Sequence, residues 1–205
     1  MDTQECLLIF TRYPEPGKTK TRLIPALGEA GAANLQQQMT QHTLKQAKEL
    51  RSQRPLSIQV YYAGGSSTVM QAWLGPDLTY CQQGVGDLGQ RMKQAFQSAL
   101  AAGMERVVAI GTDCPDIDAA ILAKALTALK QHDLVLGPAE DGGYYLIGLK
   151  RLVPELFTGI DWGTETVLRS TQHIAQTLGL TVYSLRLLND VDRPEDLSIW
   201  EPYQQ

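Results

Sequence analysis

The sequence predicts one α/β domain over residues 1–205, built on a mixed, mostly parallel sheet with helices on both faces. Short apolar runs rich in β-branched and aromatic residues alternate along the chain with longer segments of helical character. That alternation is typical of strands joined by crossover helices. With 205 residues, 43% of them hydrophobic, the chain can bury a proper core. No repeat, linker or low-complexity stretch divides the sequence.

The predicted strands and helices follow one another along the whole chain. In order, they are a strand at 7–10, a helix at 28–53, a strand at 57–63, a helix at 68–74, a strand at 78–81, a helix at 87–102, a strand at 107–110, a helix at 118–131, strands at 134–136 and 144–147, a helix at 164–178, a strand at 181–185 and a last helix from 194.

The helices are predicted from composition, spacing and their end residues, and the strands from apolar runs between turn residues. Residues 28–53 are rich in Ala, Gln, Leu and Lys and contain no proline, so nothing interrupts a long helix. In 87–102 the apolar residues recur at helical spacing, and Gly103 can end that helix. Pro194 suits the first turn of the last helix.

Composition excludes several classes of protein. The net charge of -4 disfavours a nucleic-acid surface. Cys6, Cys81 and Cys114 are odd in number and widely spaced, which fits neither a disulfide framework nor a zinc site and favours a reducing compartment. The first residues lack the pattern of a signal peptide, and no apolar run could cross a bilayer. We therefore expect a cytoplasmic protein without a membrane or nucleic-acid partner; its oligomeric state stays open.

A basic loop follows the first strand. Arg12, Lys18, Lys20 and Arg22 lie within eleven residues of an otherwise acidic chain, and the Pro-Glu-Pro-Gly turn at 14–17 stiffens the loop between them. Its glycine lets the backbone approach a ligand closely. Clustered cations call for an anion, and phosphate is the usual one. The alternative is an ordinary solvated loop.

Two glycine patterns resemble nucleotide motifs without matching their context. A P-loop would need a glycine five residues before Gly17, where Arg12 stands, so a P-loop kinase is disfavoured. Gly84, Gly86 and Gly89 spell the dinucleotide fingerprint, but Asp87 would stand at the helix N-terminus where a pyrophosphate binds. We interpret this segment as a turn with Asp87 as the helix N-cap, which in a nucleotide site can border the base.

Carboxylates follow two apolar segments near the expected carboxyl edge of the sheet. Asp113 comes just after the strand at 107–110, and a carboxylate there suits Mg²⁺ or Mn²⁺. The alternative for Asp113 is a helix cap, and for Asp116 the cap is the favoured interpretation. The spacing of Asp190 and Asp192 can place both on one side of an extended stretch. For that pair, a metal site and a helix start are both open.

Two further segments are candidates for the acceptor side of a reaction. Glu140 and Asp141 precede a double glycine, so either can act as a base beside a close backbone approach, or the segment is only a hairpin turn. Residues 162–164, Trp-Gly-Thr, can line an acceptor pocket, or Thr164 can cap its helix.

Motifs along nearly the whole chain resemble one bacterial family. They are Phe10-Thr11-Arg12, Pro14-x-Pro16-Gly17-x-x-Lys20-Thr21-Arg22-Leu23, Gly84-x-Gly86-Asp87-Leu88-Gly89-x-Arg91-Met92, Gly111-Thr112-Asp113-x-Pro115, Gly137-Pro138-x-x-Asp141-Gly142-Gly143-Tyr144 and Asp190-Val191-Asp192-x-Pro194-Glu195-Asp196-Leu197. The family comprises GT-A-type transferases often encoded beside radical-SAM proteins, some of them arsenosugar-biosynthesis glycosyltransferases. More distantly, the chain is similar to the molybdenum-cofactor and phospholactate guanylyltransferases.

The resemblance implies a Rossmann-like nucleotide-diphospho-sugar transferase (GT-A) fold that holds a divalent metal, Mg or Mn. By that analogy Asp113 and Asp192 are the metal carboxylates. The expected substrates are a nucleotide or nucleotide-sugar and a small-molecule acceptor. Glycosyl transfer is the favoured reaction; nucleotidyl transfer from an NTP, or a non-catalytic nucleotide-binding regulator, is the alternative.

The predicted site therefore has three parts. The catalytic residues are Lys20, Arg22 and Asp141; the nucleotide-binding residues are Thr11, Arg12, Gly17, Gly84 and Asp87; the metal ligands are Asp113 and Asp192.

Overall fold

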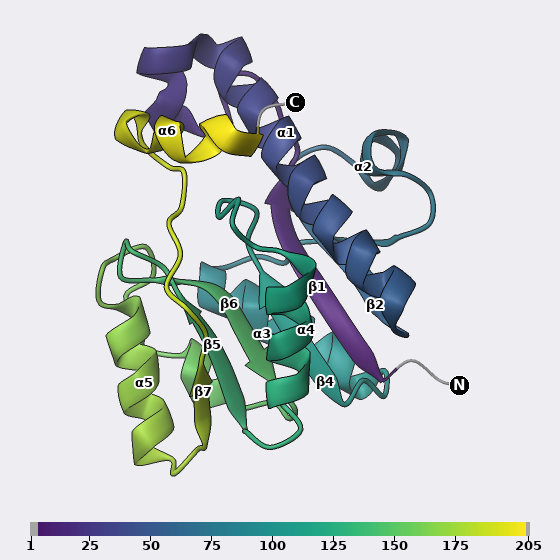
Figure 1. Cartoon of the computed structure of the whole chain (residues 1–205), viewed down its shortest axis with the longest axis vertical. Helices are drawn as coiled ribbons and strands as arrows, with labels where there is room; N and C mark the ends of the chain where they lie inside the picture. The colour runs from purple at the N-terminus through teal and green to yellow at the C-terminus, as the bar shows by residue number, and fades with distance from the viewer. Residues whose placement is uncertain (1–3, 204–205) are drawn as a thin grey trace.

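The computed structural model of the chain describes residues 4–203 and holds a sheet with helices on both faces (Figure 1). Its strands are β1 (Glu5–Arg12), β2 (Ser57–Ala63), β3 (Thr79–Gln82), β4 (Arg106–Ile110), β5 (Leu134–Pro138), β6 (Tyr144–Leu149) and β7 (Val182–Ser184). Its α-helices are α1 (Ile24–Gln53), α2 (Ser67–Leu74), α3 (Leu88–Ala101), α4 (Ala119–Ala128), α5 (Val167–Thr177) and α6 (Leu197–Trp200). Short 3-10 turns cover Thr21–Leu23, Pro154–Phe157, Pro194–Asp196 and Glu201–Tyr203.

The sheet is mixed and mostly parallel, as the sequence predicted. Its strand order is β3-β2-β1-β4-β6-β5-β7. The pairs β1/β2, β1/β4, β2/β3 and β5/β7 are parallel, whereas β6 runs antiparallel to both β4 and β5. Because of this reversal, β6 starts at the edge of the sheet where β1 and β4 end.

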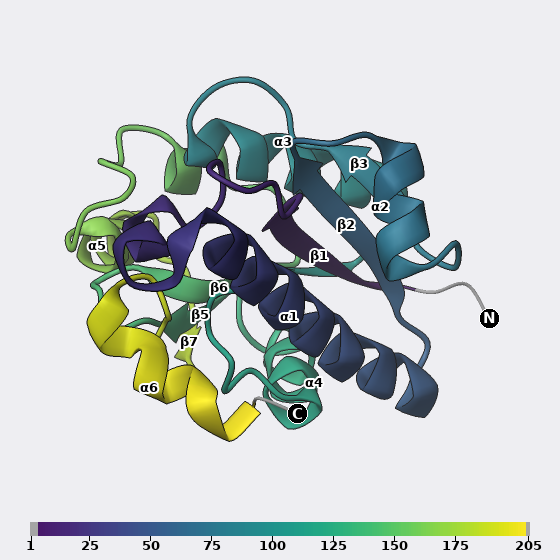
Figure 2. The ribbon, with the colours of Figure 1, turned by 90° about the horizontal axis from the view of Figure 1, so that it is seen from above.

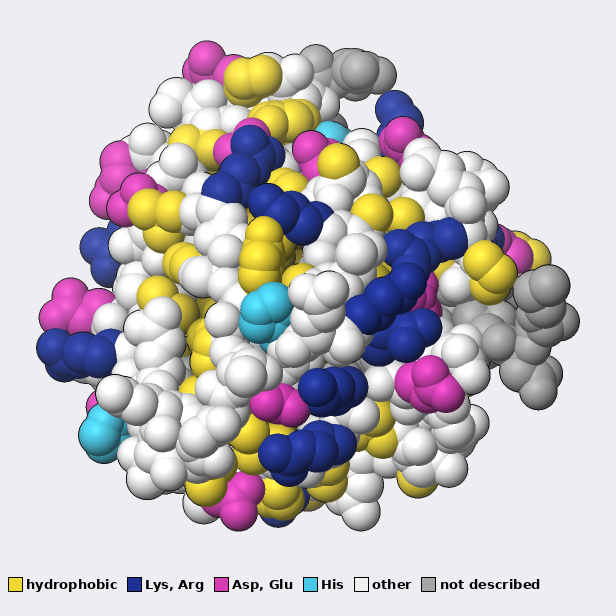
Figure 3. All heavy atoms as spheres, turned by 60° about the horizontal axis from the view of Figure 1, so that its bottom comes forward, with side chains coloured by type: hydrophobic (Ala, Val, Ile, Leu, Met, Phe, Trp, Pro, Cys, Tyr) yellow, Lys and Arg dark blue, Asp and Glu magenta, His cyan; other side chains and the backbone are white. Residues whose placement is uncertain are grey.

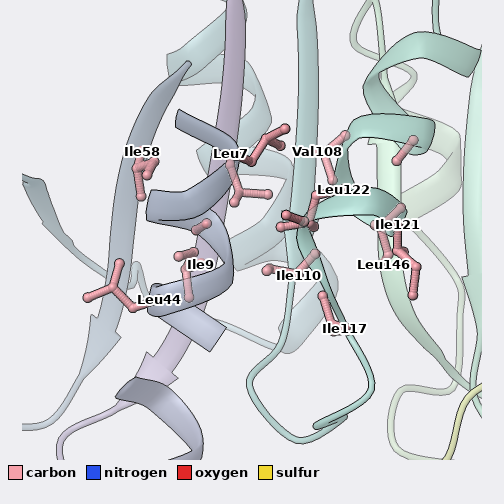
Figure 4. Close-up of a cluster of buried hydrophobic side chains, with 14 of the residues drawn as sticks. Leu7, Ile9, Leu44, Ile58, Val108, Ile110, Ile117, Ile121, Leu122 and Leu146 are labelled. Atoms are coloured by element: carbon pink, nitrogen blue, oxygen red, sulfur yellow. The ribbon is translucent and has the colours of Figure 1, made fainter. Parts of the chain in front are cut away.

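Alternating side chains of the central strands feed two cores. Leu7 and Ile9 of β1 point into the core under α1, α2 and α4, together with Val108 and Ile110 of β4 (Figure 4). The residues between them, such as Leu8, point into the core under α3 and α5. A strand buried on both faces accounts for the unbroken apolar runs in the sequence. Viewed from above, α1 and α4 lie on one side of the sheet and α3 on the other (Figure 2).

A third, smaller core fixes the last part of the described chain. Trp200 of α6 and Val191 pack against Leu23 and Leu35, at the start of α1. This contact places α6 beside α1 at the end of the molecule toward which β1 runs (Figure 1). Helix α1 is broken at Gly28, where φ is +70°, so its regular part begins where the sequence predicted the helix to start.

The opposite end of the sheet is stabilised by ion pairs. Glu5 at the start of β1 accepts hydrogen bonds from Arg54 (2.5 Å) and Arg106 (3.0 Å). Figure 3 turns the bottom of Figure 1 toward the viewer and shows Lys and Arg side chains gathered over part of that face, with acidic side chains among them. Among residues 4–203, none of the helices combines the length and the apolar composition that a bilayer span requires.

Candidate active site

A cavity of about 450 Å³ opens at the carboxyl edge of the sheet, where β1 and β4 end and β6 begins. Six predicted site residues line it: Thr11, Arg12, Lys20, Asp113, Asp141 and Asp192. Ligands of open α/β sheets bind beyond the carboxyl ends of the strands, so this is the expected place. The remaining four, Gly17, Arg22, Gly84 and Asp87, do not line the cavity.

Lys20 is the buried cation of this cavity. Its ammonium group lies 2.7 Å from Asp113 Oδ1 and donates a second hydrogen bond of 2.7 Å to the carbonyl of Val191. Only 4% of its side chain is exposed, against 67% for Lys18 in the same loop. Among the described residues, Lys20 is the only non-glycine with a positive φ, +44°. The loop therefore turns in a left-handed conformation that directs this cation inward.

Val191 holds the two late aspartates in place. Its N–H donates to the carbonyl of Asp113 (2.8 Å) and its carbonyl accepts from Lys20. The Val191 side chain is fully buried, so Asp190 and Asp192, its two neighbours, project to the other side and both line the cavity. The predicted placement of this Asp-x-Asp pair on one side is confirmed.

Burial and the neighbouring carboxylates of the cavity act on Asp190. Burial, followed by the charge of Asp141 and of the other neighbouring carboxylates, raises the pKa of Asp190 from 3.8 to about 6. Asp113 is balanced by Lys20, and Asp192 forms an ion pair with Arg22. The negative charge on Asp190 has no such partner among the described residues, so this part of the cavity favours a cation.

Four predicted residues lie outside the cavity lining. Arg22 reaches the site only through its ion pair with Asp192. Gly17 adopts a φ of +76° in the basic loop. Asp87 is the N-cap of α3, as the sequence analysis favoured, since its side chain accepts from the N–H of Gln90 at 2.8 Å. Gly84 precedes that helix in the loop after β3. The nucleotide-binding role predicted for Gly17, Gly84 and Asp87 therefore depends on a ligand that extends beyond this lining.

The prediction that Asp116 caps the following helix was wrong. Helix α4 is capped by Asp118, whose Oδ1 accepts from the N–H of Ile121 at 2.7 Å. The Asp116 carboxylate instead accepts a hydrogen bond from the hydroxyl of Tyr203. An intervening turn, closed by a bond from the Ile117 N–H to the Cys114 carbonyl, delays the helix start by two residues. The alternative interpretation of Asp113 as a helix cap is not supported either, because its side chain pairs with Lys20 and the cap of α4 is Asp118.

The turn between β5 and β6 is both a hairpin and part of the site. Ala139 donates to the carbonyl of Gly143 and Gly142 donates to that of Ala139, which closes the hairpin. Asp141 accepts from the N–H of Gly143 at 2.8 Å and lines the cavity, whereas Glu140 does not. Of the two carboxylates considered as a base, the structure therefore brings only Asp141 to the site.

The segment Trp162-Gly163-Thr164 lines the cavity. That it meets an acceptor there stays a prediction. Thr164 is not the cap of α5: that helix begins at Val167, and the Thr164 hydroxyl donates to the carbonyl of Asp161 at 2.8 Å. Trp162 meets Tyr144 edge to face, with 6.3 Å between ring centres.

Sequence reasoning missed two amides that shape the site. Gln36 of α1 is buried, and its amide nitrogen lies within hydrogen-bonding distance of the hydroxyls of Thr11 (3.3 Å), Thr40 (3.1 Å) and Thr112 (3.4 Å), which joins α1 to the ends of β1 and β4. Gln83 donates to the carbonyls of Thr11 and Tyr61, both at 3.0 Å. Helix α1 contains several glutamines, and nothing in the sequence around Gln36 shows that this one is buried.

Comparison with known proteins places the chain in a family. Residues 43–164 match the family described as "Uncharacterized protein conserved in bacteria (DUF2064)". The chain belongs to this family. A protein from Desulfovibrio desulfuricans G20, provisionally named a nucleotide-diphospho-sugar transferase, is 36% identical, with a TM-score of 0.88 over all of this chain and 89% of its own. No curated protein matches the sequence.

More distant structures share the fold alone. A CMP:2-keto-3-deoxy-manno-octonic acid synthetase complexed with CTP is 12% identical, with a TM-score of 0.58 over 95% of each chain. Rv0371c from Mycobacterium tuberculosis H37Rv, complexed with manganese, is 14% identical, with a TM-score of 0.56 over 95% of this chain and 96% of its own. These likenesses confirm the predicted nucleotide-diphospho-sugar transferase-like fold. The synthetase and the D. desulfuricans protein, as named, fall in the transferase class.

Proposed function

We propose that this protein is a metal-dependent transferase that moves a sugar from a nucleotide-sugar donor to a small-molecule acceptor. The observation that carries the proposal is the convergence of Lys20 with Asp113, Asp141 and Asp192 on one cavity at the carboxyl edge of the sheet. These residues come from four separate segments of the chain. The 36% identical relative with its nucleotide-diphospho-sugar name supports the same assignment.

The donor occupies the side of the cavity formed by the end of β1 and the basic loop. Thr11 and Arg12 follow β1, and Lys20 reaches inward from the loop. In this proposal Lys20 and Arg12 neutralise the diphosphate, and Arg22 supports Asp192 from outside. Gly17, Gly84 and Asp87 border the nucleotide where it leaves the cavity.

The carboxylates fit a magnesium or manganese ion that the donor helps to hold. Among residues 4–203 there is no ready group of three side chains of the kind that hold a metal without help. Mg²⁺ usually keeps several waters and binds one or two carboxylates together with substrate phosphates, so such a group is not required. Asp113 and Asp192 would hold the ion, with Asp190 beside them. When bound, the ion supplies positive charge to the diphosphate oxygens.

The transfer itself uses this chain's carboxylate and cations. The acceptor oxygen forms a bond to the anomeric carbon while the bond from that carbon to the diphosphate oxygen breaks. Asp141 takes the proton of the acceptor hydroxyl, and a nucleoside diphosphate leaves. Lys20 and Arg12 stabilise the charge that develops on the leaving diphosphate.

Nucleotidyl transfer is the second candidate, and the CTP complex of the structurally similar synthetase favours it. In that reaction an acceptor oxygen attacks the α-phosphorus of an NTP and pyrophosphate leaves. The same cations would then neutralise the pyrophosphate. A non-catalytic nucleotide-binding regulator would need the cations but not the carboxylates.

The deciding experiment measures which product leaves. The protein is incubated with each nucleotide-sugar or NTP, Mn²⁺ and a pool of cell metabolites, and nucleoside diphosphate and pyrophosphate are assayed separately. We expect nucleoside diphosphate that depends on Asp113. Asp141→Asn should lose transfer and still bind donor, whereas Glu140→Gln, one residue away but outside the cavity, should keep both. Pyrophosphate with no nucleoside diphosphate would establish the second candidate, and no product from any donor would favour the regulator.

A further inference from the structure

The cavity has an aromatic wall, which we define as Leu88, Met92, Tyr144, Trp162 and Val167. Trp162 is its centre. Gly89 of α3 makes room for the indole, since a Cβ at that position would collide with Trp162 Nε1 and lie 2.6 Å from the Phe157 carbonyl. The tryptophan therefore rests directly on the backbone of α3.

The aromatic wall lies beside Asp141. Gly142 packs so tightly against the Glu165 backbone that an added Cβ would lie 2.6 Å from the Glu165 Cα, and its carbonyl accepts from the N–H of Leu168. The turn that carries Asp141 is thus joined to the start of α5, next to Val167. A molecule on this wall would present its polar groups to Asp141.

The charge of the cavity is unfavourable for a second anion. The carboxylates of its lining are Asp113, Asp141, Asp190 and Asp192, and its cations are Arg12 and Lys20. Arg22 also neutralises Asp192 from outside the lining, so four carboxylates face three cations and the excess is one negative charge. A divalent metal would reverse this excess, and the two negative charges of a donor's diphosphate would make the occupied cavity negative again. A phosphate monoester would add roughly -1.5 to -2 more. The wall itself adds no cation, and burial raises the pKa of Tyr144, which keeps its hydroxyl neutral.

Groups of this chain already occupy part of the two helix ends at the wall. Helix N-termini can bind phosphate through free N–H groups. At α5, however, Val167 donates to the carbonyl of Thr164 and Leu168 donates to that of Gly142. At α3, the carboxylate of Asp87 already caps the helix. Neither end compensates for the missing cation.

We propose that the aromatic wall binds the acceptor, and that this acceptor is an uncharged hydroxyl compound with an apolar face rather than a phosphate monoester. A sugar ring or an aryl alcohol has the required face, since the apolar side of a ring packs on indole and its hydroxyls point to Asp141. The inference rests on the proposed function in calling this compound the acceptor, but its binding is testable without turnover.

The test compares phenyl β-D-glucoside with its 6-phosphate by calorimetry on the whole protein, with Mn²⁺ and a nucleoside diphosphate, which supplies the charge of the donor without a sugar to transfer. We expect the glucoside to bind at least about tenfold more tightly, the ratio that corresponds to roughly 1.4 kcal/mol of like-charge repulsion. Trp162→Ala should weaken glucoside binding by about the same factor. Trp73→Phe, at a tryptophan outside the cavity, should leave it unchanged.

A gain-of-function variant completes the test. Leu88 is 44% exposed at the start of α3, so Leu88→Lys places a cation on the wall without opening a core. It should raise the affinity for the 6-phosphate relative to that for the glucoside, because any loss of apolar contact with Leu88 affects both ligands alike. Equal or tighter binding of the 6-phosphate to the wild type, or glucoside binding that is absent or insensitive to Trp162→Ala, would overturn the proposal. Failure of the transferase assignment would instead appear as no Asp113-dependent product from any donor.

Discussion

Replacing Lys20 by glycine separates the charge of this residue from its role in the loop. The side chain is 4% exposed and its ammonium group bonds both Asp113 and the Val191 carbonyl. The backbone at this position is left-handed, with φ +44° and ψ +47°. Glycine adopts that conformation freely, so Lys20→Gly removes the cation and eases the backbone at the same time.

The expected effects on stability nearly cancel. Asp113 is 51% exposed, so water can solvate it after the lysine is removed, and such a pair contributes about 0–1 kcal/mol. The bond to the Val191 carbonyl adds about 1 kcal/mol. Relief of the left-handed backbone returns about 1–2 kcal/mol. The free energy of unfolding should therefore stay within about 1 kcal/mol of the wild type.

The expected effect on turnover is much larger. Removing one positioned donor from a site of developing charge lowers kcat by about 100- to 1000-fold. The assay measures nucleoside diphosphate release together with urea unfolding, for Lys20→Gly and for Lys18→Gly as the matched control. Lys18 pairs only with Glu15 on the surface of the same loop, so its variant should keep wild-type turnover. Equal turnover in the two variants would refute the assignment of Lys20 to the diphosphate.

Three further predictions concern the carboxylates and one glycine. Asp113→Asn should lower turnover about 100-fold or more and remove the metal dependence of nucleotide binding in calorimetry, whereas Asp116→Asn, outside the cavity, should change neither. The folded protein holds the Asp190 proton up to about pH 6 and the unfolded chain releases it near 3.8. Stability therefore falls as pH rises through that window, and Asp190→Asn should raise the melting temperature at pH 8 and barely change it below pH 4; equal gains at both would contradict the burial of this charge. Gly142→Ala, at φ +85° against the Glu165 backbone, should cost about 1–3 kcal/mol in urea unfolding and weaken acceptor binding; wild-type values would show that the turn is loose.

The sequence predicted the elements of the fold because burial leaves a local pattern. Strand β2 was predicted with its observed bounds, Ser57–Ala63, because β-rich residues end at a double glycine. The alternation of Asp190, Val191 and Asp192 predicted which side chains share a side, since period two belongs to any extended stretch. These features depend only on neighbours in the sequence.

Contacts between distant segments could not be predicted in the same way. Lys20 and Asp113 are 93 residues apart, and nothing local distinguishes Lys20 from Lys18, which remains on the surface. The helix predicted at 118–131 begins at its observed N-cap, Asp118, but the cap was assigned to Asp116, whose carboxylate instead contacts Tyr203, 87 residues further along the chain. Packing between distant segments decides which lysine is buried and which aspartate caps the helix.

The donor and acceptor parts of the proposed site come from two separate segments of the sequence, and the reversed strand β6 belongs to the second. The residues proposed to bind phosphate belong to the segment from the end of β1 to the loop after it, whereas Asp141 lies in the turn before β6, Tyr144 starts that strand, and Trp162 lies between it and α5. Because β6 starts at the shared edge and Trp162 also lines the cavity there, the two parts of the site meet in space although they are separate segments of the sequence. Exchange of residues 139–167 between relatives should therefore transfer acceptor preference as a cassette, while the choice of donor stays with the host chain.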